Sequence, residues 1–546
     1  MLCFTDSTEN FNLLIENKKE IKIYGYFFEC IPHCHFDFLD DKNEGACNYA
    51  LPGIAGLVYF ILLFYFKTDF VLLNSGLVTG FWATLTPITV IMGAVLFNNF
   101  QQKTGNQAVI NRWMSSITPN PVAQMMIIGY AFAFMIEGAS GFGTPAAIAA
   151  PILIALGFEP LKVVIAVLIF NSIPVSFGAV GTPTWFGFGS LGLTNQQITE
   201  LGLKAAIVHV TAGLVIPLIA LKYVFEWKEI KQNLVYIYLT VFACALPMML
   251  LATINYEFPS LLGGAIGFII AIFLAKKRIG LKKDDSLQEV SAGVNSKELF
   301  KALLPLISLV LILVVTRVPQ LGIKNLLRTE DLLFKADLGI FDLEVTKALK
   351  ITLANVFGTN SSESFELLYA PAFIPFFLIV FALAWLYPSM KGNVWKTISQ
   401  TAHQVSEPFF ALLGGVTMVK FMLLNGDQSM VSIIGMSLAA ATGPFWGLFA
   451  SYLGAIGAFF SGSATISNLI FGGVQQSIAT QTGLNMTSIL AMQSVGGAMG
   501  NMTCVNNIIA ASSVSGVRRK EGYIMQKTAV PMFIYGIIAA LVGLFL

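Results

Sequence analysis

The chain has 546 residues, of which 56% are hydrophobic and only 11% are charged, and its mean hydropathy is +0.74. Water-soluble domains carry about 25% charged residues, so this composition excludes a soluble globular protein. The net charge of +2 gives no sign of a nucleic-acid partner.

Many uncharged runs approach the length of about 20 residues that a helix needs to cross hydrocarbon. A membrane barrel would instead show short segments of alternating hydrophobicity. The sequence therefore predicts an all-α polytopic membrane protein, with the membrane domain covering residues 50–546.

Residues 1–49 form a polar, irregular tail that carries four of the six cysteines. Its run CIPHCH, at residues 30–35, contains cysteine and histidine side chains, but their spacing matches no standard zinc pattern. We therefore expect reduced thiols in an unstructured cytoplasmic tail and no metal site. No cleavable signal peptide is visible in this tail.

The spans are predicted from the apolar runs that follow the tail. A first span is expected at 50–66, a longer apolar stretch with a bend at 69–97, and a polar loop at 101–120. Further single spans are expected at 233–254, 258–275, 298–316, 368–388 and 528–546.

The orientation is predicted from lysine and arginine. These residues cluster in the loops near 276–283 and 518–527, and short positive loops stay on the cytoplasmic side of a membrane. Placing both loops inside gives consistent crossings and leaves residues 317–367 as a long external loop of mixed charge.

An apolar stretch is interrupted at residues 137–148, which read EGASGFGTPAAI. Non-helical backbone within a membrane is tolerated only where protein or a water-filled cavity surrounds it. The glycines let the chain leave a helix at low steric cost, while Thr144 can cap and Pro145 can begin a restarted helix. The unpaired N–H groups and partial positive charge at such a helix start suit a carboxylate.

A second broken region, SGSATISNLIFGG at 461–473, is similar to the first, and residues 178–181 align with 497–500. Transporters are often built from two repeats, each with an interrupted span near mid-membrane. We predict about 11–14 transmembrane helices in two inverted repeats, each with an interrupted or re-entrant helical hairpin. The first repeat covers about 50–275 and the second about 298–546. Close helix packing is the alternative explanation of the glycines.

Glu137 is the candidate proton-coupling residue. An ionisable side chain within a membrane is expensive and usually marks an ion or proton pathway. Burial favours the neutral form of a carboxyl group, so Glu137 could bind and release a proton near neutral pH. The alternative is a structural acid that is hydrogen-bonded to facing hydroxyl groups.

The candidate substrate-binding residues come from both broken regions and offer backbone N–H groups, hydroxyls or amides to an anion. They are Gly138, Ser140, Gly141, Gly143, Thr144, Asn171, Ser461, Ser463, Thr465, Ser467 and Asn468.

Two cations are further candidates for contact with a substrate carboxylate. Lys420 lies deep in an apolar run, and Arg317 has the planar fork that matches a carboxylate. The alternatives are a lysine that reaches the membrane interface and an arginine that anchors a span there. His209 and His403 could also titrate.

Five motifs together resemble the L-lactate permease family. They are EGASGFGTPAAI with the following NSIPVSFGAVGTP, and FFSGSATISNLIFGGVQ followed by MQSVGGAMGN and RRKEG. The resemblance covers about residues 67–546. It implies a carrier of the bacterial inner membrane that moves L-lactate, and often D-lactate and glycolate, together with protons. It implies no cofactor.

The chain departs from the family at two places. The family usually has another apolar span before residues 50–66, where this chain has a polar tail, as an aberrant start of translation would produce. Many members have a lysine after the glycine where this chain has Gly500 and Asn501. We hypothesise that Lys420 supplies the missing charge.

Other functions stay open at this point. Backbone carbonyls at broken helices can hold Na⁺, so a Na⁺-coupled carboxylate carrier is the first alternative. An anion channel, which needs a continuous lined pore, is the second. An enzyme is not expected, because the sequence has no convincing metal cluster, nucleotide loop or nucleophile–base pair.

Overall fold

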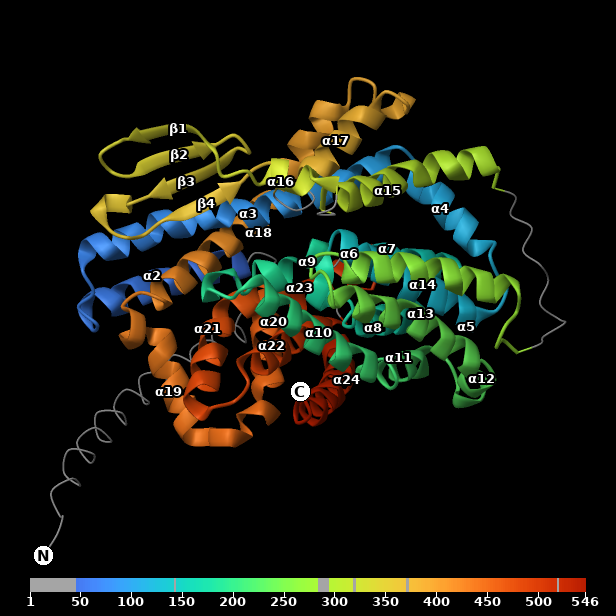
Figure 1. Cartoon of the computed structure of the whole chain (residues 1–546). Helices are drawn as coiled ribbons and strands as arrows, with labels where there is room; N and C mark the ends of the chain where they lie inside the picture. The colour runs from blue at the N-terminus through green and yellow to red at the C-terminus, as the bar shows by residue number, and fades with distance from the viewer. Residues whose placement is uncertain (1–45, 142–143, 283–293, 318–320, 370–372, 518–519) are drawn as a thin grey trace, which may run out of the picture.

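The computed structural model describes residues 46–546, apart from 142–143, 283–293, 318–320, 370–372 and 518–519 (Figure 1). The run CIPHCH and almost all of the predicted tail lie outside the described residues. The described residues form mainly helices, together with one small sheet.

A group of helices lies along one side of the molecule (Figure 1). In the sequence, some of them come before the first broken region and the others lie between the two broken regions. The two longest of them, α3 and α18, pack against each other, and α18 also packs on α2. The group consists of α2 (Ala46–Phe64), α3 (Phe70–Lys103), α4 (Asn106–Ser115), α15 (Ser296–Arg317), α17 (Phe373–Ala384) and α18 (Val394–Met422). The polar loop predicted at 101–120 is therefore wrong, because helices α3 and α4 occupy most of it.

The part of the first repeat that follows α4 begins with a helix that is π-helical in its middle, which is a rare geometry that often occurs at functional sites. Its parts are α5 (Pro121–Gln124), η1 (Met125–Phe132), α6 (Ala133–Ala139), α7 (Thr144–Ala155), α8 (Pro160–Phe170), η2 (Val175–Phe177), α9 (Gly178–Trp185), η3 (Gly189–Leu191), α10 (Asn195–Ala212), α11 (Ile216–Val224), α12 (Trp227–Gln232), α13 (Leu234–Ala252) and α14 (Pro259–Lys276).

The second repeat has the same succession of breaks. Its parts are α19 (Met430–Thr442), η8 (Gly443–Leu448), α20 (Ala450–Ser461), α21 (Ala464–Thr482), α22 (Met486–Gly500), η9 (Asn501–Thr503), α23 (Val505–Val514) and α24 (Glu521–Gly543). A hairpin interrupted at its tip, a third helix, a short broken element and a fifth helix follow one another in both halves.

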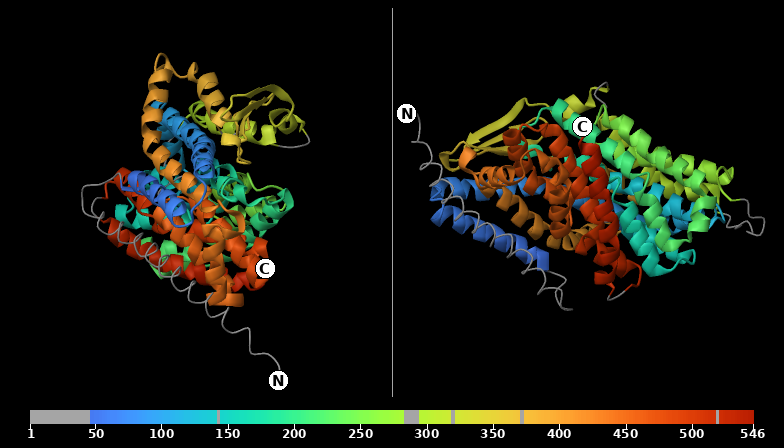
Figure 2. Two further views of the ribbon diagram at one scale, coloured as in Figure 1. Left: turned by 90° about the vertical axis from the view of Figure 1, so that its left-hand side faces the viewer. Right: turned by 90° about the horizontal axis from the view of Figure 1, so that it is seen from below.

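The contacts between the two repeats are reciprocal. Helix α9 packs against α21, and its counterpart α23 packs against α7. Likewise α10 packs against α22, and its counterpart α24 packs against α8. The halves are thus related by an approximate twofold, and Figure 2 shows α24 crossing between them in the view from below.

Several helices have the length and composition of membrane spans. Among the residues that the structure describes, five helices of 18 or more residues are apolar enough to cross a membrane, two bent helix pairs are so when taken together, and shorter apolar helices accompany them. The predicted spans at 233–254, 258–275, 298–316, 368–388 and 528–546 correspond to α13, α14, α15, α17 and α24. The prediction of a helical polytopic membrane protein with interrupted hairpins is confirmed.

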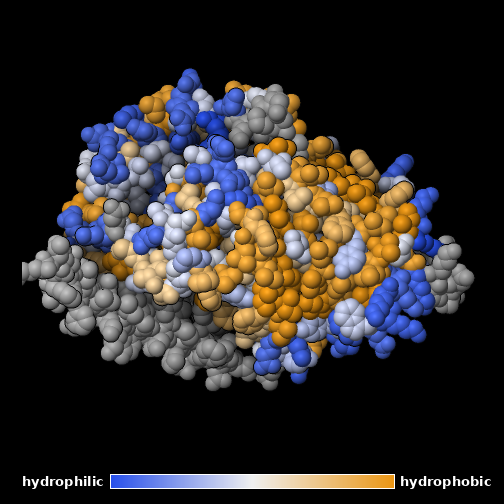
Figure 3. All heavy atoms as spheres, turned by 60° about the horizontal axis from the view of Figure 1, so that its bottom comes forward, coloured by the Kyte–Doolittle hydropathy of each residue, from blue (hydrophilic) through white to orange (hydrophobic). Residues whose placement is uncertain are grey.

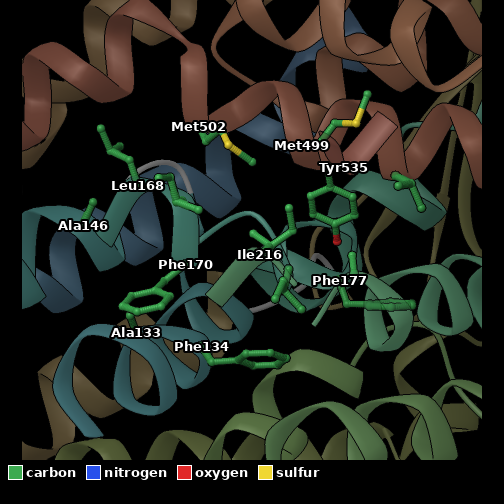
Figure 4. Close-up of a cluster of buried hydrophobic side chains, with 14 of the residues drawn as sticks. Ala133, Phe134, Ala146, Leu168, Phe170, Phe177, Ile216, Met499, Met502 and Tyr535 are labelled. Atoms are coloured by element: carbon green, nitrogen blue, oxygen red, sulfur yellow. The ribbon is translucent and has the colours of Figure 1, made fainter. Parts of the chain in front are cut away.

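Buried and exposed apolar residues are both abundant, as a bilayer requires. Figure 4 shows Met499 and Met502 of the second repeat above Leu168, Phe170 and Ile216 of the first, all of them buried. Figure 3 shows a broad hydrophobic outer face bordered by polar residues. Exposed side chains on α13, α14 and α24 are of this kind, among them Val235, Leu250, Ile269, Phe273, Phe533 and Ile537.

The loop predicted at 317–367 contains a sheet. Its strands β1 (Leu332–Asp337), β2 (Asp342–Thr346), β3 (Lys350–Ala354) and β4 (Glu363–Glu366) are antiparallel and adjacent in chain order. The indole of Trp82 on α3 donates to the carbonyl of Ile351 at 3.2 Å, and the hydroxyls of Ser75 and Ser361 lie 2.9 Å apart. The sheet is thus fastened to α3 (Figure 1).

Candidate functional site

The tip of the first hairpin is built around Gly141. Helix α6 ends at Ala139, and Gly141 has a φ of +60°, which favours glycine. A Cβ at this position would lie 3.1 Å from the Cβ of Ala179 and 3.4 Å from Glu137 Oε1. Ser140 donates from its hydroxyl to the carbonyl of Ile136 at 3.1 Å. Thr144 begins α7, while Gly143 lies outside the described residues.

Glu137 lies one helical turn before this break and is 2% exposed. The amide nitrogen of Asn171, where α8 ends, donates to Glu137 Oε2 at 3.1 Å. The described residues place no cation in an ion pair with this carboxylate. A buried carboxylate without a cation is costly to keep ionised, so its environment suits a group that gains and loses a proton.

The other side of the Glu137 carboxylate is closed by the backbone of Gly178. A Cβ at Gly178 would lie 2.4 Å from Glu137 Oε1, so a side chain at position 178 would displace the carboxylate. The amide oxygen of Asn171 is buried and has no hydrogen-bond partner among the described residues. The amide oxygen of Asn171 is therefore an available hydrogen-bond acceptor close to Glu137.

The segment after Gly178 has an unusual backbone. Ala179, Val180 and Gly181 have φ values of 44°, 56° and 71°, and left-handed geometry costs an alanine or valine roughly 1–2 kcal/mol. The hydroxyl of Thr182 donates to the carbonyl of Ala179, and the indole of Trp185 donates to that of Val180 at 3.1 Å. Strained segments held in this way are typical of functional sites.

The tip of the second hairpin is built from serines and one glycine. Helix α20 ends at Ser461, Gly462 has a φ of +73°, and Ser463 caps α21 by accepting from the N–H of Ile466 at 3.4 Å. The Ser461 hydroxyl donates to the carbonyl of Gly457 at 2.7 Å. Thr465 in the first turn of α21 is 4% exposed. Ser461, Ser463 and Thr465 are thus brought together.

Asn468 joins the two broken regions. Its amide nitrogen donates to the carbonyl of Pro183 on α9 at 2.9 Å, and its neighbour Ser467 donates to the carbonyl of Gly454 at 2.6 Å. Because α9 begins beside Glu137 and ends beside Asn468, it connects the acid of the first repeat with the hydroxyl cluster of the second.

Two glutamines and a tryptophan behind Asn468 were not predicted. Gln493 on α22 donates to the hydroxyl of Ser467 at 3.1 Å. Gln475 on α21 donates to Gln493 at 2.8 Å and accepts from the indole of Trp446 at 2.6 Å. The sequence signal that could have identified them is the presence of glutamines within apolar runs. They orient Ser467 and Asn468 from behind.

A second buried network links α10 and α24, the counterparts of each other in the two repeats. Nδ1 of His209 bonds to the hydroxyl of Tyr535, and its Nε2 lies 2.8 Å from the hydroxyl of Ser176 in η2. The Ser494 hydroxyl lies 3.0 Å from that of Ser176. His209 is therefore tied to the break between α8 and α9.

Two predicted site residues, Gly138 and Lys420, have other contacts in the structure, and a third, Arg317, is described only in its backbone. A Cβ at Gly138 would lie 2.1 Å from the backbone nitrogen of Leu261 on α14, so close helix packing accounts for this glycine. Lys420 on α18 forms an ion pair with Glu363 of β4. Arg317 ends α15, and its side chain lies outside the part of the chain that the structure describes.

A cavity of about 400 Å³ extends from the sheet toward the broken segments. Its wall includes Lys420 and Glu363 on the side of the sheet, and Trp185, Phe186 and Leu469 on the side of α9 and α21. Leu469 follows Asn468 directly in the sequence. We name this space the inner cavity. Within the described residues, no cluster of three or more His, Cys, Asp or Glu side chains could hold a metal ion.

Comparison with known proteins shows the family of the chain. Residues 42–546 match the L-lactate permease family. The chain is 51% identical over 511 residues to a Haemophilus influenzae protein assigned as an L-lactate permease, covering 93% of this chain and 96% of that one. It is 24% identical to the L-lactate permease of Escherichia coli, with 94% of each chain covered. Identity to the glycolate permease of the same organism is 25%, with 92% of each covered.

The match covers nearly the whole membrane domain, including both interrupted hairpins and the segments between them. The family is one of permeases, so the protein is a membrane transport protein. The chain belongs to the L-lactate permease family.

Proposed function

We propose that this protein is a secondary transporter that takes up L-lactate across the bacterial inner membrane in symport with protons. The observation that carries this proposal is the Glu137 carboxylate, which is buried between the tip of the first hairpin and the start of α9 and accepts a hydrogen bond from the amide of Asn171. D-lactate and glycolate are further substrates, because they share the 2-hydroxy acid group.

Glu137 is the proton carrier in this proposal. When it is ionised, Asn171 donates to it. When it is protonated, its O–H becomes a donor, and the burial of the carboxyl group is then far less costly. A proton on Glu137 therefore permits a second carboxylate, that of the substrate, to approach the same region without repulsion between like charges.

The substrate carboxylate is placed at the helix starts of the two hairpins, where N–H groups are unpaired and the helix end is partly positive. Ser461, Ser463 and Thr465 surround the start of α21, and Thr144 lies at the start of α7. The free amide oxygen of Asn171 accepts from the 2-hydroxyl of the substrate. Gly141 and Gly143 let the backbone approach the ligand closely.

The remaining predicted contacts have defined places in this proposal. Ser140 and Gly138 shape the end of α6. Ser467 holds α21 against α20, and Asn468 holds α21 against α9. A site that pairs the hydroxyl of a 2-hydroxy acid discriminates strongly against analogues that lack it. Acetate and propionate are therefore expected to be poor competitors of lactate. Lys420 and Arg317 stay predicted contacts of the substrate carboxylate.

The experiment is uptake of labelled L-lactate into proteoliposomes with an imposed pH gradient and no Na⁺. Wild-type protein is expected to accumulate lactate, and Glu137→Gln is expected to lose gradient-driven accumulation while exchange of lactate across the membrane persists. Glu159→Gln is the matched control, because Glu159 is an acid of the same repeat whose side chain is 55% exposed.

Each other outcome has a definite meaning. Equal accumulation by wild type and Glu137→Gln would remove Glu137 from the proton path. Uptake that needs added Na⁺ would replace proton coupling by Na⁺ coupling. Downhill flux that does not saturate would indicate an anion channel and contradict a transporter altogether.

A further inference from the structure

Two hollows meet at one ion pair on the side of the sheet. The inner cavity of about 400 Å³ is lined there by Arg328 and Glu366. A second hollow of about 250 Å³, which we name the outer hollow, is also lined by Arg328 and Glu366, together with Lys350 and Glu330. The Arg328–Glu366 pair is therefore the partition between the outer hollow and the inner cavity.

The Arg328–Glu366 ion pair is long and partly exposed, as expected of a pair in which another carboxylate can replace Glu366. Arg328 Nη2 lies 3.3 Å from Glu366 Oε1, and the side chains are 45% and 29% exposed. Strong arginine–carboxylate pairs are shorter, at about 2.7–2.9 Å, and often use two parallel hydrogen bonds. The guanidinium of Arg328 also lies 4.9 Å from the centre of the Tyr369 ring, which holds it in place independently of Glu366.

We propose that Arg328 forms an outer binding subsite for a small monocarboxylate, which enters the inner cavity by taking the place of Glu366 on the guanidinium. This proposal rests on the proposed function, and it adds the entry step on the side of the sheet. The incoming ligand and Glu366 are both carboxylates, so the exchange leaves the arginine paired throughout. The partly exposed Arg328 therefore keeps a carboxylate partner at each stage of the exchange.

The displaced Glu366 has a nearby cation to receive it. Lys350 of β3 lines the outer hollow beside Glu366, and its ammonium group lies 3.4 Å from the carboxylate of Glu330. The side chain of Glu330 is 83% exposed, and such surface pairs contribute little to stability. Lys350 can therefore exchange Glu330 for Glu366 when the ligand binds to Arg328.

A second pair of the same kind lies farther in. Lys420 is paired with Glu363, which belongs to the same strand as Glu366. The charged side chains that line the inner cavity are Glu257, Arg328, Glu363, Glu366 and Lys420. These are three acids and two cations, so the cavity offers an incoming anion no net positive charge. The anion enters by successive exchange, first at Arg328 and then at Lys420.

The first test is the concentration dependence of L-lactate uptake by cells that express the protein, at matched surface quantities. Loss of one charge-assisted contact is worth roughly a tenfold change in affinity, so Arg328→Gln is expected to raise the KM for external lactate about tenfold and to change the maximal rate less than about twofold. Arg328→Lys is expected to restore part of the affinity. Efflux from preloaded cells is expected to keep its KM.

Lys347→Gln is the matched control, because Lys347 of the same sheet forms a comparable exposed pair with Asp331 at 3.0 Å and lines neither hollow. It is expected to leave the KM unchanged. A normal KM in Arg328→Gln, or an equal rise in Lys347→Gln, would overturn the subsite.

The second test does not need transport. Ser364 lines the inner cavity, so Ser364→Cys can be labelled with an anionic or a cationic methanethiosulfonate, measured above the labelling of the parent chain. Adding Arg328→Gln is expected to slow the anionic reagent selectively, and external lactate is expected to do the same. An unchanged ratio of the two rates would refute anion entry at Arg328. The same labelling experiment in Glu137→Gln, in which proton coupling is removed, distinguishes failure of the Arg328 subsite from failure of the proposed function.

Discussion

The contact between Gly178 and Glu137 allows one substitution to test the position of the carboxylate. Gly178 has φ −64° and ψ 160°, which alanine adopts without strain. The added Cβ would lie 2.4 Å from Glu137 Oε1 and 3.2 Å from its Cδ. An ordinary contact needs about 3.5 Å. Gly178→Ala therefore moves the carboxylate by about 1 Å and leaves the backbone free to keep its conformation.

The expected result is loss of transport in a folded protein. A displacement of about 1 Å at a reacting centre can cost about 100-fold in rate, whereas one extra methyl group in a core costs about 1–3 kcal/mol. We expect gradient-driven lactate uptake to fall by about this factor. Uptake in proteoliposomes is measured beside the thermal unfolding of the same detergent-purified protein.

Two glycines provide matched controls for Gly178→Ala. A Cβ at Gly202 would meet the Phe177 ring at an ordinary 3.4 Å, so Gly202→Ala should keep both transport and stability. A Cβ at Gly138 would lie 2.1 Å from the Leu261 backbone, so Gly138→Ala should impair folding itself. Wild-type uptake by Gly178→Ala would refute the argument that Glu137 must occupy its observed position. If Gly178→Ala is destabilised as much as Gly138→Ala, the added Cβ disturbs more than the Glu137 carboxylate.

Two further predictions concern buried polar contacts. Tyr535→Phe keeps the ring but leaves Nδ1 of His209 without its partner, so unfolding should become easier by about 1–3 kcal/mol; an unchanged melting temperature would show that this bond contributes nothing. Lys420→Met removes the partner of Glu363 and should weaken lactate affinity by about tenfold; a normal KM would exclude Lys420 from the substrate path.

The interrupted hairpins could be predicted because the signal is local. Glycine and serine within an uncharged run mark a break regardless of what surrounds it, and Gly141 and Gly462 have the positive φ values that such breaks use. The predicted alignment of 178–181 with 497–500 was wrong in register, because 178–181 begin α9 whereas 497–500 end α22, which is the counterpart of α8. The left-handed backbone of Ala179 and Val180 could not be foreseen, because tertiary contacts impose it against the preference of these residues.

The partners of the site residues depend on contacts between distant segments. Asn171 follows Glu137 by 34 residues, and Glu363 precedes Lys420 by 57, so sequence alone could propose these residues but not their pairing. The sheet at 332–366 was missed although Leu343 and Val345 alternate with acidic residues. The segment is short and of mixed charge, and its strands are defined mainly by their pairing with one another.

One feature of the two repeats bears on the energetics of the cycle. The halves match in their breaks, but Glu137 is the single acidic residue between Asp69 and Glu159, and the chain has none between Asp427 and Glu521. The second hairpin therefore carries no counterpart of the acid. With Glu137 as the coupling site, one proton accompanies one monoanion and the cycle moves no net charge. Such a transporter responds to the difference in pH across the membrane and is indifferent to the membrane voltage.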